Sequence, residues 1–338
     1  MKTIAFFDTK PYDKKSFDAA NKLYGYNIHY FDVKLNSETA SLAKGADVVC
    51  VFVNDRIDAE AASSLAACGI KLIALRCAGF NNIDLKAASQ KIKIVRVPAY
   101  SPHAVAEHAV SLLMCMTRSI HRAYYRVREG NFSLAGLTGR DLYGKTAGIV
   151  STGKIGRITA GILRGIGMKI LAYDKFPDES WAAAGGISYV PLEELCSKSD
   201  VISLHSPLTP ETHHMINEKT LSLMKEDAVI INTGRGALID TKALVNALKH
   251  KRLGGAGLDV YEEEEHYFFE DMSNEALKDD VLARLLTFPN VIITGHQAFL
   301  TEEALGAIAE TTLKNVHDFF NSAPLVNEVR YDAALSHV

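Results

Sequence analysis

Short runs of hydrophobic residues alternate with helix-like patterns along most of this chain of 338 residues. Parallel strands that are buried on both faces are typically short, continuous apolar runs, and the helices between them show a longer period. The first part of the chain predicts helices at residues 37–43 and 59–67, and strands at residues 3–8, 27–31, 48–53, 72–76 and 94–96. This alternation predicts an α/β fold with a parallel sheet.

The alternation becomes more regular from residue 145 onward. Strands are predicted at residues 146–150, 169–173, 201–204, 229–232, 256–259 and 291–293. A helix-sized segment separates most of these strands from the next, as in a doubly wound sheet. One more helix is predicted at 301–321, followed by a short tail from Pro324 that we expect to pack back on the first part.

Two prolines, Pro98 and Pro102, bracket a short extended link that we interpret as a hinge near residue 100. A helix is predicted directly after it, with Ser101 as its cap, and its apolar pattern continues to Met116. The poorly periodic segment 124–139 predicts a loop that covers the site or an interface. With a second hinge near residue 299, we predict a substrate domain of residues 1–100 plus 300–338, and an inserted cofactor domain of residues 101–299.

Composition excludes several classes of protein. A chain of this length is longer than one hydrophobic core usually supports, so two domains are expected. The chain is 48% hydrophobic and 23% charged, with a formal net charge of -3. It contains no block of basic residues, so its composition gives no support for nucleic-acid binding. No apolar stretch approaches the ~20 residues of a membrane helix, and the first residues lack the pattern of a secretory signal.

Cysteine and histidine positions give no sign of a metal site. The five cysteines are odd in number and widely spaced, which predicts neither a disulfide framework nor a zinc site. Their use favours a reducing compartment, and we expect a cytoplasmic protein. Most of the 12 histidines must be unremarkable, and the adjacent pair His213 and His214 does not share one face of a helix. We therefore predict no metal.

The segment after the predicted strand 146–150 has the pattern of a dinucleotide-binding turn. Gly153 would let the backbone approach a pyrophosphate, and Gly156 would let helix and strand pack closely. Asp174 follows the next strand at the spacing expected for the acid that bonds the ribose hydroxyls, which favours NAD over NADP. Ser151 occupies the place of the first glycine, so we expect weakened cofactor binding. The turn also contributes Thr152, Lys154 and Ile155 to the predicted cofactor site.

Three residues after the later strands suit the reduction of a 2-oxo acid by a nicotinamide. Arg235 can clamp a carboxylate with two parallel bonds and polarise a carbonyl group. His296 can donate a proton as a general acid/base, and Glu264 would orient this histidine and raise its pKa. Each residue also has a simpler interpretation. An arginine between glycines can be a solvated turn residue, and the acidic run 262–265 can be a solvated loop face.

The chain resembles the D-isomer-specific 2-hydroxyacid dehydrogenases over essentially its whole length. Within that family it is most similar to the fermentative, NAD-dependent D-lactate dehydrogenases. The segments that carry the resemblance are residues 76–84, 97–108, 131–134, 232–240, 259–262, 268–271 and 295–299. The resemblance implies a Rossmann-like doubly wound cofactor domain inserted in a smaller flavodoxin-like α/β substrate domain. It also implies a homodimer, or a homotetramer of such dimers.

The same resemblance implies roles for further residues. Ala78 and Gly79 offer backbone N–H groups to the substrate carboxylate, and Tyr100 lies at the same end. Phe52 and Phe299 line the side-chain pocket, where two rings favour pyruvate over longer oxo acids. The implied cofactor contacts are His205, Ser206, Pro207, Thr212, Thr233, Gly234 and Asp259.

The resemblance leaves other functions open. A reductase of glyoxylate, hydroxypyruvate or another 2-oxo acid would share these motifs. An NAD-sensing binding protein of the corepressor type would keep the Arg235, Glu264 and His296 set as well. The serine at position 151 also fits a weakly active paralogue. Turnover of oxo acids distinguishes an enzyme from both of the last two classes.

Overall fold

The computed structural model describes residues 1–264 and 267–331. Glu265 of the acidic run and residues 332–338 of the predicted first domain lie outside the described residues. The chain divides into two compact units: unit 1 is Met1–Ser101 with Leu300–Val338, and unit 2 is Pro102–Phe299. These boundaries differ by one residue from the hinge that the sequence predicts near residue 100.

Unit 1 contains a five-stranded parallel sheet with the strand order β2-β1-β3-β4-β5, which is the flavodoxin-like order. Its five strands overlap the first five apolar runs of the sequence. The central strands β3 and β4 are buried along their whole length, which explains why their runs are continuously apolar. The strands are β1 (Thr3–Phe6), β2 (Asn27–Tyr30), β3 (Val48–Val51), β4 (Leu72–Leu75) and β5 (Lys93–Val95).

Helices and the returning tail complete unit 1. Its helices are α1 (Pro11–Asn21), η1 (Ala40–Ala43), α2 (Ala59–Ala67), α3 (Leu85–Ala88) and α12 (Glu302–Phe320). Helix α12 packs on α1 and β4, whereas α2 packs on α3 and η1. After α12 the tail returns to the sheet, where the Val329 N–H donates to the Ile94 carbonyl at 2.9 Å. The tail thus packs on the first part of the chain, as the sequence predicts.

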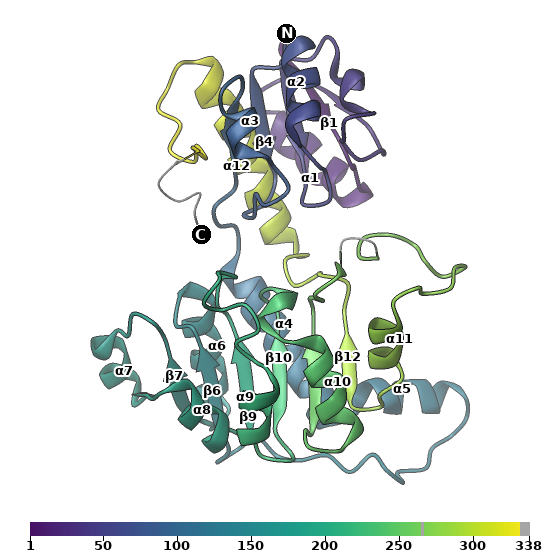
Figure 1. Ribbon diagram of the computed structural model, residues 1–338, viewed down its shortest axis with the longest axis vertical. Coiled ribbons are helices and arrows are strands. Elements are labelled where there is room, and N and C mark those ends of the chain that lie inside the picture. Colours follow the sequence, from purple (N-terminus) through teal and green to yellow (C-terminus); the bar gives the residue numbers. More distant parts are fainter. Residues whose placement is uncertain (265–266, 332–338) are drawn as a thin grey trace. The chain divides into compact units, whose positions relative to one another are not determined.

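Unit 2 contains a seven-stranded parallel sheet with the order β12-β11-β10-β9-β6-β7-β8 (Figure 1). The strands are β6 (Thr146–Val150), β7 (Lys169–Tyr173), β8 (Ser188–Tyr189), β9 (Val201–Leu204), β10 (Val229–Asn232), β11 (Gly255–Leu258) and β12 (Val291–Ile293). Strand β6 lies between β7 and β9, so the direction of winding reverses there. Ligands of doubly wound sheets bind at the carboxyl ends of the strands next to this reversal.

Helices cover both faces of this sheet. Helices α4 (Pro102–Thr117) and α6 (Lys154–Gly165) pack together on one face, over a core that includes Leu112, Leu163 and Ile231. The other face carries α8 (Leu192–Lys198), α9 (Glu218–Leu223), α10 (Thr241–Lys249) and α11 (Asp280–Leu286). The remaining elements are α5 (Ile120–Arg128), α7 (Glu179–Gly185) and the 3-10 turn η2 (Gly236–Leu238). Among the helices that the structure describes, none combines the length and apolar character needed to cross a bilayer.

The prediction of a helix at residues 37–43 is wrong, since only the 3-10 turn η1 forms there. Side chains compete with the helix for its backbone groups. The Asn36 carboxamide oxygen accepts from the N–H groups of Glu38 and Thr39 at 2.9 and 3.0 Å, and the Thr39 hydroxyl donates to the Lys34 carbonyl at 2.7 Å. The backbone therefore turns before a full α-helix can begin.

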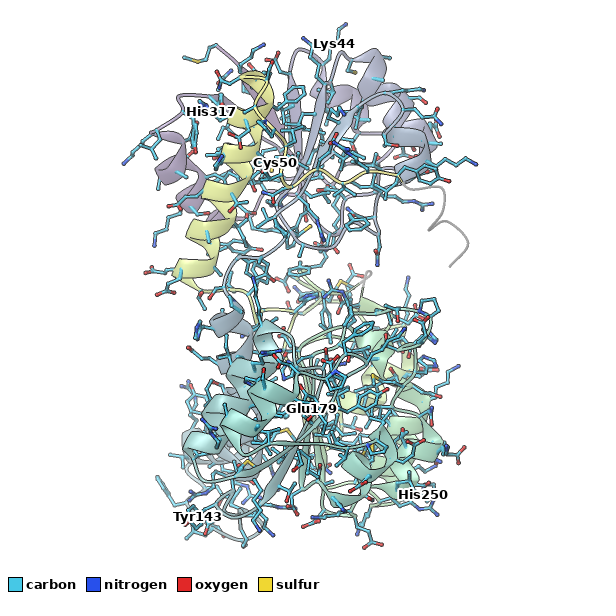
Figure 2. All side chains as sticks on the ribbon, turned by 90° about the vertical axis from the view of Figure 1, so that its left-hand side faces the viewer. Lys44, Cys50, Tyr143, Glu179, His250 and His317 are labelled. Atoms are coloured by element: carbon cyan, nitrogen blue, oxygen red, sulfur yellow. The ribbon has the colours of Figure 1, made fainter. Side chains whose placement is uncertain are left out.

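The prediction of a loop at residues 124–139 is wrong for its first part, where α5 continues to Arg128. This helix is amphipathic, yet it has no buried residue, so its apolar side chains do not face the core of this chain. Exposed apolar and aromatic side chains continue beyond the helix through Phe132 and Leu134 to Tyr143, which Figure 2 labels. Because the apolar residues of α5 do not face the core, the sequence pattern of a core-facing helix does not predict it.

Candidate active site

The candidate residues of unit 2 gather at one edge of its sheet. Because all seven strands are parallel, the segments that follow them leave the sheet at the same edge. Ser151 follows β6, His205 follows β9, Thr233 follows β10, Asp259 follows β11 and Thr294 follows β12. The topology thus brings together residues up to 143 positions apart.

The turn after β6 adopts the conformation that the missing glycine would favour. Ser151 has a φ of 74°, in the left-handed region, and its N–H donates to the Tyr173 carbonyl at 2.7 Å. A side chain in this region costs about 1 kcal/mol. A Cβ atom at Gly156 would lie 2.0 Å from the Ser151 carbonyl oxygen, so this second glycine is required for close packing of helix and strand.

The N-terminus of α6 is suited to an anion. Gly153 is the N-cap residue and provides no side-chain hydrogen bond to the first N–H groups of the helix. A Cβ atom at this position would meet nothing within 4 Å, so the approach to the helix end is open. Free N–H groups and the helix dipole both favour a phosphate there. Lys154 and Ile155 form the first residues of this helix.

Asp174 is bound to the turn rather than free. Its Oδ2 accepts from the Thr152 N–H at 2.6 Å and from the Thr152 hydroxyl at 3.0 Å, and its Oδ1 accepts from the Phe176 N–H at 2.9 Å. Partial burial opposes the charged form, but these hydrogen bonds outweigh it and hold the pKa of Asp174 below its ordinary value. The Thr152 side chain therefore braces Asp174, while lone pairs of the carboxylate remain for ribose hydroxyls.

The segment after β9 contains a neutral histidine and a closed turn. Burial lowers the pKa of His205 to about 4, and its Nε2 lies 2.9 Å from the Ser203 hydroxyl. Thr212 closes the turn: its hydroxyl donates to the Pro207 carbonyl at 2.7 Å and accepts from the Thr209 N–H at 2.8 Å. Ser206 in this turn is buried, whereas Pro207 is exposed.

The segment after β10 holds Arg235 by its backbone. The Asn232 side chain accepts from the Gly234 N–H at 3.0 Å and donates to the Arg235 carbonyl at 2.9 Å. The Arg235 guanidinium donates to the Gly234 carbonyl at 2.8 Å and remains partly exposed. The hydroxyl of Thr233 is buried and has no hydrogen-bond partner among the described residues. A buried hydroxyl of this kind fits a ligand group at the strand end.

Close backbone contact places the Arg235 segment against the segment that carries Glu264. A Cβ atom at Gly236 would lie 2.1 Å from the Tyr261 carbonyl carbon and 2.4 Å from the Glu262 nitrogen. Only glycine allows the two backbones to approach this closely. The arginine segment and the acidic segment are therefore neighbours at the same edge of the sheet.

Glu264 and His296 form a hydrogen-bonded pair. The Glu264 Oε1 lies 2.8 Å from the His296 Nδ1, and the Glu264 Oε2 accepts from the Tyr261 N–H at 3.0 Å. The two side chains are 23% and 21% exposed, so solvent or a ligand can reach them. Because Nδ1 faces the carboxylate, Nε2 is the nitrogen left to exchange a proton with a substrate.

Asp259 organises the turn on which His296 lies. This fully buried carboxylate accepts from the Thr294 hydroxyl at 2.5 Å and from the N–H groups of Gln297 and Ala298 at 2.9 and 2.8 Å. His108 on α4 approaches the same carboxylate, with its Nε2 3.3 Å from Oδ1. Sequence reasoning gave no role to Thr294 or His108. No pattern in the sequence links His108 to Thr294, which lies 186 residues further along the chain.

The residues predicted for substrate binding belong mostly to unit 1. Phe52 follows β3 and is 7% exposed, with its N–H donating to the Asp55 carboxylate at 2.6 Å. Ala78 and Gly79 follow β4, and the Ala78 carbonyl accepts from Arg96 at 2.8 Å. Tyr100 lies near the end of the first segment of unit 1, and Phe299 is the last residue of unit 2. Their roles in substrate binding stay predictions.

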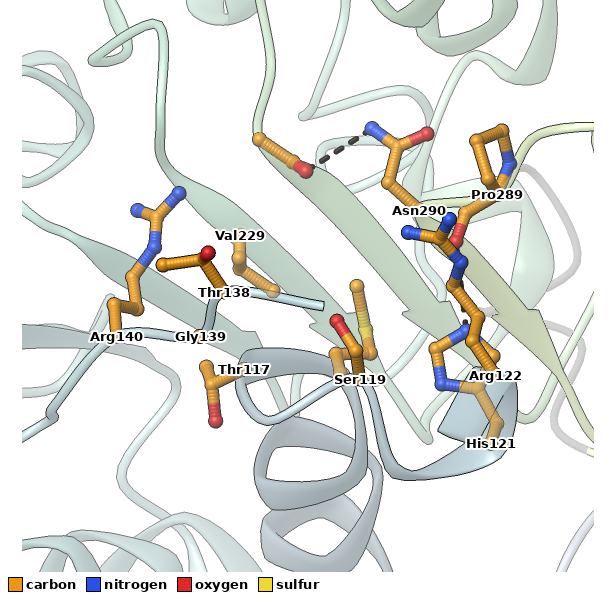
Figure 3. A pocket seen from close by; sticks show the side chains of 12 residues that line it. Thr117, Ser119, His121, Arg122, Thr138, Gly139, Arg140, Val229, Pro289 and Asn290 are labelled. Carbon is orange, nitrogen blue, oxygen red and sulfur yellow. Dashed lines mark hydrogen bonds between the residues drawn. The ribbon is translucent and has the colours of Figure 1, made fainter. Parts of the chain in front are cut away.

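A separate cavity of unit 2 lies at the opposite edge of the sheet (Figure 3). It is lined by Val229 and Asn290, which are near the amino ends of β10 and β12, and by Thr117 and Arg140. None of the catalytic, substrate-binding or cofactor-binding residues predicted from sequence lines it. The carboxyl edge, with its histidine, carboxylate and arginine, is therefore the candidate active site.

Comparisons with known proteins show the family to which this chain is similar. Residues 110–298 match the family model described as "D-isomer specific 2-hydroxyacid dehydrogenase, NAD binding domain". The chain is 50% identical over 327 residues to the D-lactate dehydrogenase of Escherichia coli, covering 96% of this chain and 99% of that protein. It is 52% identical over 315 residues to a 2-hydroxyacid dehydrogenase homolog of Haemophilus influenzae, covering 93% and 95%.

The fold is also that of solved structures. The structure of the pyruvate reductase of Chlamydomonas reinhardtii superposes with a TM-score of 0.93 at 43% identity, over 97% of this chain and 98% of that chain. Residues 110–298, which match the family model of an NAD-binding domain, contain the turn before α6, Arg235, Glu264 and His296. The chain therefore belongs to the D-isomer specific 2-hydroxyacid dehydrogenases and is an NAD-dependent oxidoreductase.

Proposed function

We propose that this enzyme reduces pyruvate reversibly to D-lactate with NADH. The observation that carries the proposal is the Glu264–His296 pair, 2.8 Å apart, at the sheet edge that also holds Arg235. The relatives named as D-lactate dehydrogenases support the choice of substrate. A 2-oxo acid requires a carboxylate clamp, a proton donor for the carbonyl oxygen and a hydride donor.

His296 supplies the proton in this mechanism. NADH, when bound, supplies the hydride that adds to C2 of pyruvate, and the electron pair of the C=O π bond moves to oxygen. His296 gives its Nε2 proton to that oxygen, which yields the hydroxyl group of lactate. In the reverse direction the neutral imidazole takes the proton back. Glu264 holds the ring in place through Nδ1, so that the correct nitrogen faces the substrate.

Arg235 holds the substrate carboxylate in our proposal. A guanidinium group can donate two parallel hydrogen bonds to a carboxylate, and its charge also stabilises the developing oxyanion. We expect Ala78 and Gly79 to add backbone N–H donors and Tyr100 to add its hydroxyl at the same carboxylate. Phe52 and Phe299 would then enclose the methyl group of pyruvate.

The cofactor contacts follow from the strand ends. The pyrophosphate would lie at the N-terminus of α6, next to Gly153, where the helix presents free N–H groups. The unpartnered hydroxyl of Thr233 fits the nicotinamide end. Asp174 would accept hydrogen bonds from the ribose hydroxyls and repel a 2′-phosphate. We propose that Ser206, Pro207, Thr212, Gly234 and Asp259 line the remaining cofactor surface.

We also propose that the protein assembles as a homodimer, or as a homotetramer of dimers, through the exposed apolar face that starts at α5. Exposed apolar side chains that are grouped together on a surface are typical of an interaction site. The exposed side chains of this face are Ile120, Tyr124, Tyr125, Val127, Phe132 and Leu134. A second copy of the same face is the occupant that this proposal predicts.

Steady-state NADH oxidation with pyruvate, glyoxylate, hydroxypyruvate and phenylpyruvate tests the substrate, with the chirality of the product assayed. We expect the highest kcat/KM for pyruvate and D-lactate as the product. His296→Ala should lower kcat/KM about 10²- to 10⁴-fold, the size of a general acid–base contribution. Arg235→Ala should raise KM for pyruvate and lower kcat as well.

Control variants separate a chemical effect from a loss of fold. His250→Ala removes an exposed histidine of the same unit, labelled in Figure 2, and should leave kcat/KM unchanged. Glu264→Gln should keep the structure yet lower kcat, since an amide still bonds the ring but carries no charge. Faster turnover of glyoxylate or hydroxypyruvate than of pyruvate would contradict the proposed substrate. Full activity in His296→Ala would contradict the proposed mechanism.

A further inference from the structure

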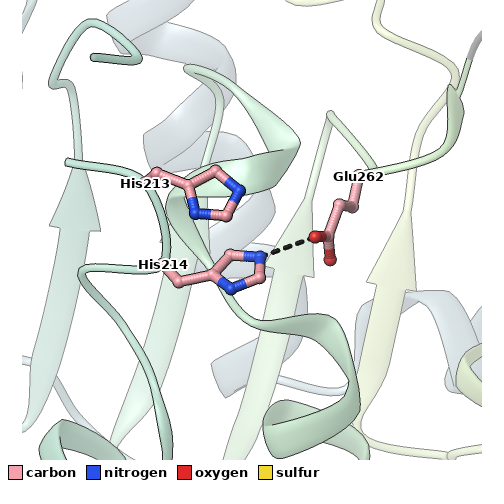
Figure 4. A group of neighbouring side chains, drawn as sticks. All are labelled: His213, His214 and Glu262. Carbon is pink, nitrogen blue, oxygen red and sulfur yellow. Dashed lines mark hydrogen bonds and ion pairs between the residues drawn. The ribbon is translucent and has the colours of Figure 1, made fainter. Parts of the chain in front are cut away.

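A second cluster of metal-ligating side chains lies in unit 2, outside the candidate active site. It consists of His213, His214 and Glu262 (Figure 4). Each offers one imidazole nitrogen or carboxylate oxygen, and these three atoms lie within 4.8 Å of one another. Sequence reasoning excluded a metal here, because neighbouring residues on a regular helix or strand point in different directions.

The backbone explains why the two histidines point the same way. His214 has a φ of 50°, in the left-handed region, and its N–H donates to the Ala237 carbonyl at 2.8 Å. The two imidazole rings consequently stack, with centroids 3.9 Å apart and planes inclined by 26°. Figure 4 shows both rings on the same side of the chain as Glu262, which lies 48 residues further along.

Glu262 is held in position by hydrogen bonds on both carboxylate oxygens. Its Oε2 accepts from the Thr241 hydroxyl at 2.8 Å and from the Thr241 N–H at 3.3 Å, while its Oε1 lies 2.6 Å from the His214 Nε2. One oxygen is thus anchored by threonine and the other faces the imidazoles.

We propose that His213, His214 and Glu262 form a binding site for a divalent transition-metal ion of the zinc type. Two imidazoles with one carboxylate are a set that zinc accepts, and the fourth position would hold water. Donor atoms on one zinc ion lie roughly 3–3.5 Å apart, given bonds of about 2.0–2.1 Å. The three donor atoms of this cluster lie within 4.8 Å of one another, so the ion would have to draw them closer on binding. Imidazole donors disfavour Mg²⁺ and Ca²⁺. This site is independent of the proposed oxo acid chemistry.

Calorimetric titration of the chelator-treated full chain with zinc chloride tests the proposal, with the bound metal counted by atomic absorption. We expect one Zn²⁺ per chain at pH 7, weaker binding at pH 5.5 because the imidazoles must lose their protons, and no heat from Mg²⁺. His213→Ala should weaken the Kd by at least about tenfold, the loss that even a supporting group of a zinc site causes. His213 is exposed, so this variant should fold normally.

Two further variants locate the ion. Thr241→Val removes the hydroxyl that anchors Glu262 and should weaken the Kd about 10- to 100-fold. His121→Ala is the matched control, because His121 is another histidine of unit 2 and its Nδ1 lies 3.8 Å from the Cys115 sulfur, a competing pair of zinc ligands. An unchanged Kd in His213→Ala, or loss of binding in His121→Ala, would overturn the proposal. Zn²⁺ should also raise the Tm of the parent chain, and it should raise the Tm of His213→Ala by less.

Discussion

The two units of this protein differ in where they place buried charge. Unit 1 buries Asp8, Asp13, Asp55 and Arg76 in its interior. Unit 2 covers both faces of its sheet with apolar side chains, and the one charged residue that it fully buries within the described part of the chain, Asp259, lies at the carboxyl edge of the strands. The buried charges of unit 1 therefore lie inside its core, whereas the buried charge of unit 2 supports the turn that carries His296.

Arg76 is the centre of the charged group in unit 1. Its guanidinium donates to the Asp8 carbonyl at 2.7 Å, and its Nε lies 3.5 Å from the Asp13 carboxylate. It also lies 4.5 and 4.8 Å from the ring centroids of Phe6 and Phe52. Arg76 follows β4 and thus packs against the ring of Phe52, which follows β3 and which we expect to line the substrate pocket.

The largest effect that we predict comes from removing this arginine. Arg76→Met leaves the buried Asp13 carboxylate without its counter-charge, so we expect the free energy of unfolding to fall by about 3–5 kcal/mol. Denaturant titration measures it. Arg56→Met, which changes an exposed arginine of the same unit, should shift this free energy by less than about 0.5 kcal/mol. Equal losses in the two variants would contradict a special role for buried charge.

The pH dependence of stability should have opposite signs in the two units. Burial raises the pKa of Asp55 to about 7, so the folded state holds this proton more tightly than the unfolded chain does. Its contribution to stability is present below about pH 4 and is lost as the pH rises toward 7. Burial lowers the pKa of His205 to about 4, so its contribution is present above about pH 6.5 and is lost as the pH falls toward 4.

Thermal unfolding between pH 4 and pH 8 separates these contributions. In the parent chain, the loss of the Asp55 proton should lower Tm between pH 4 and pH 7. In Asp55→Asn this decrease should be smaller, even if Tm is lower at every pH. Protonation of His205 should destabilise the parent chain as the pH falls below about 6.5, and His205→Gln should remove this loss. We expect the loss to be about 1 kcal/mol, because part of His205 is exposed and solvent reduces the effect of burial. Identical slopes in the variants and the parent chain would show that neither group titrates differently in the folded state.

The smallest effect that we predict concerns the turn after β6. Ser151→Gly removes a side chain from a left-handed conformation, so it should stabilise the bound form of the turn by up to about 1 kcal/mol. We expect the NADH dissociation constant to fall up to about fivefold in a fluorescence titration. Gly153→Ala, at a neighbouring glycine with a negative φ, serves as the comparison. An unchanged or higher dissociation constant in Ser151→Gly would contradict this view of the turn.

Most of the secondary structure could be predicted because buried parallel strands are continuous apolar runs. The predicted strands at 146–150, 169–173 and 229–232 have the bounds of β6, β7 and β10. Strand β8 was missed because two residues give no pattern. Helix α5 was missed because its apolar face does not contribute to the core of this chain.

The candidate site could be predicted in part for a topological reason. Parallel strands end at one edge, so residues directly after them in the sequence, such as Arg235 and His296, become neighbours in space. The hydrogen bonds that hold this edge could not be predicted. Asp259 with Thr294 and His108, and Glu262 with His214, join segments 35 to 151 residues apart. Their geometry depends on turns with a positive φ at His214 and His296.

The sequence alone determined the two-part α/β organisation, the dinucleotide turn and the three residues proposed for catalysis, because local apolar patterns and strand-end positions carry this information. Only the tertiary structure decided that Ser151 adopts a left-handed conformation, that Arg76 is buried among carboxylates and that His213 and His214 face Glu262. These features depend on how distant segments pack and on backbone dihedral angles that residue identity does not fix.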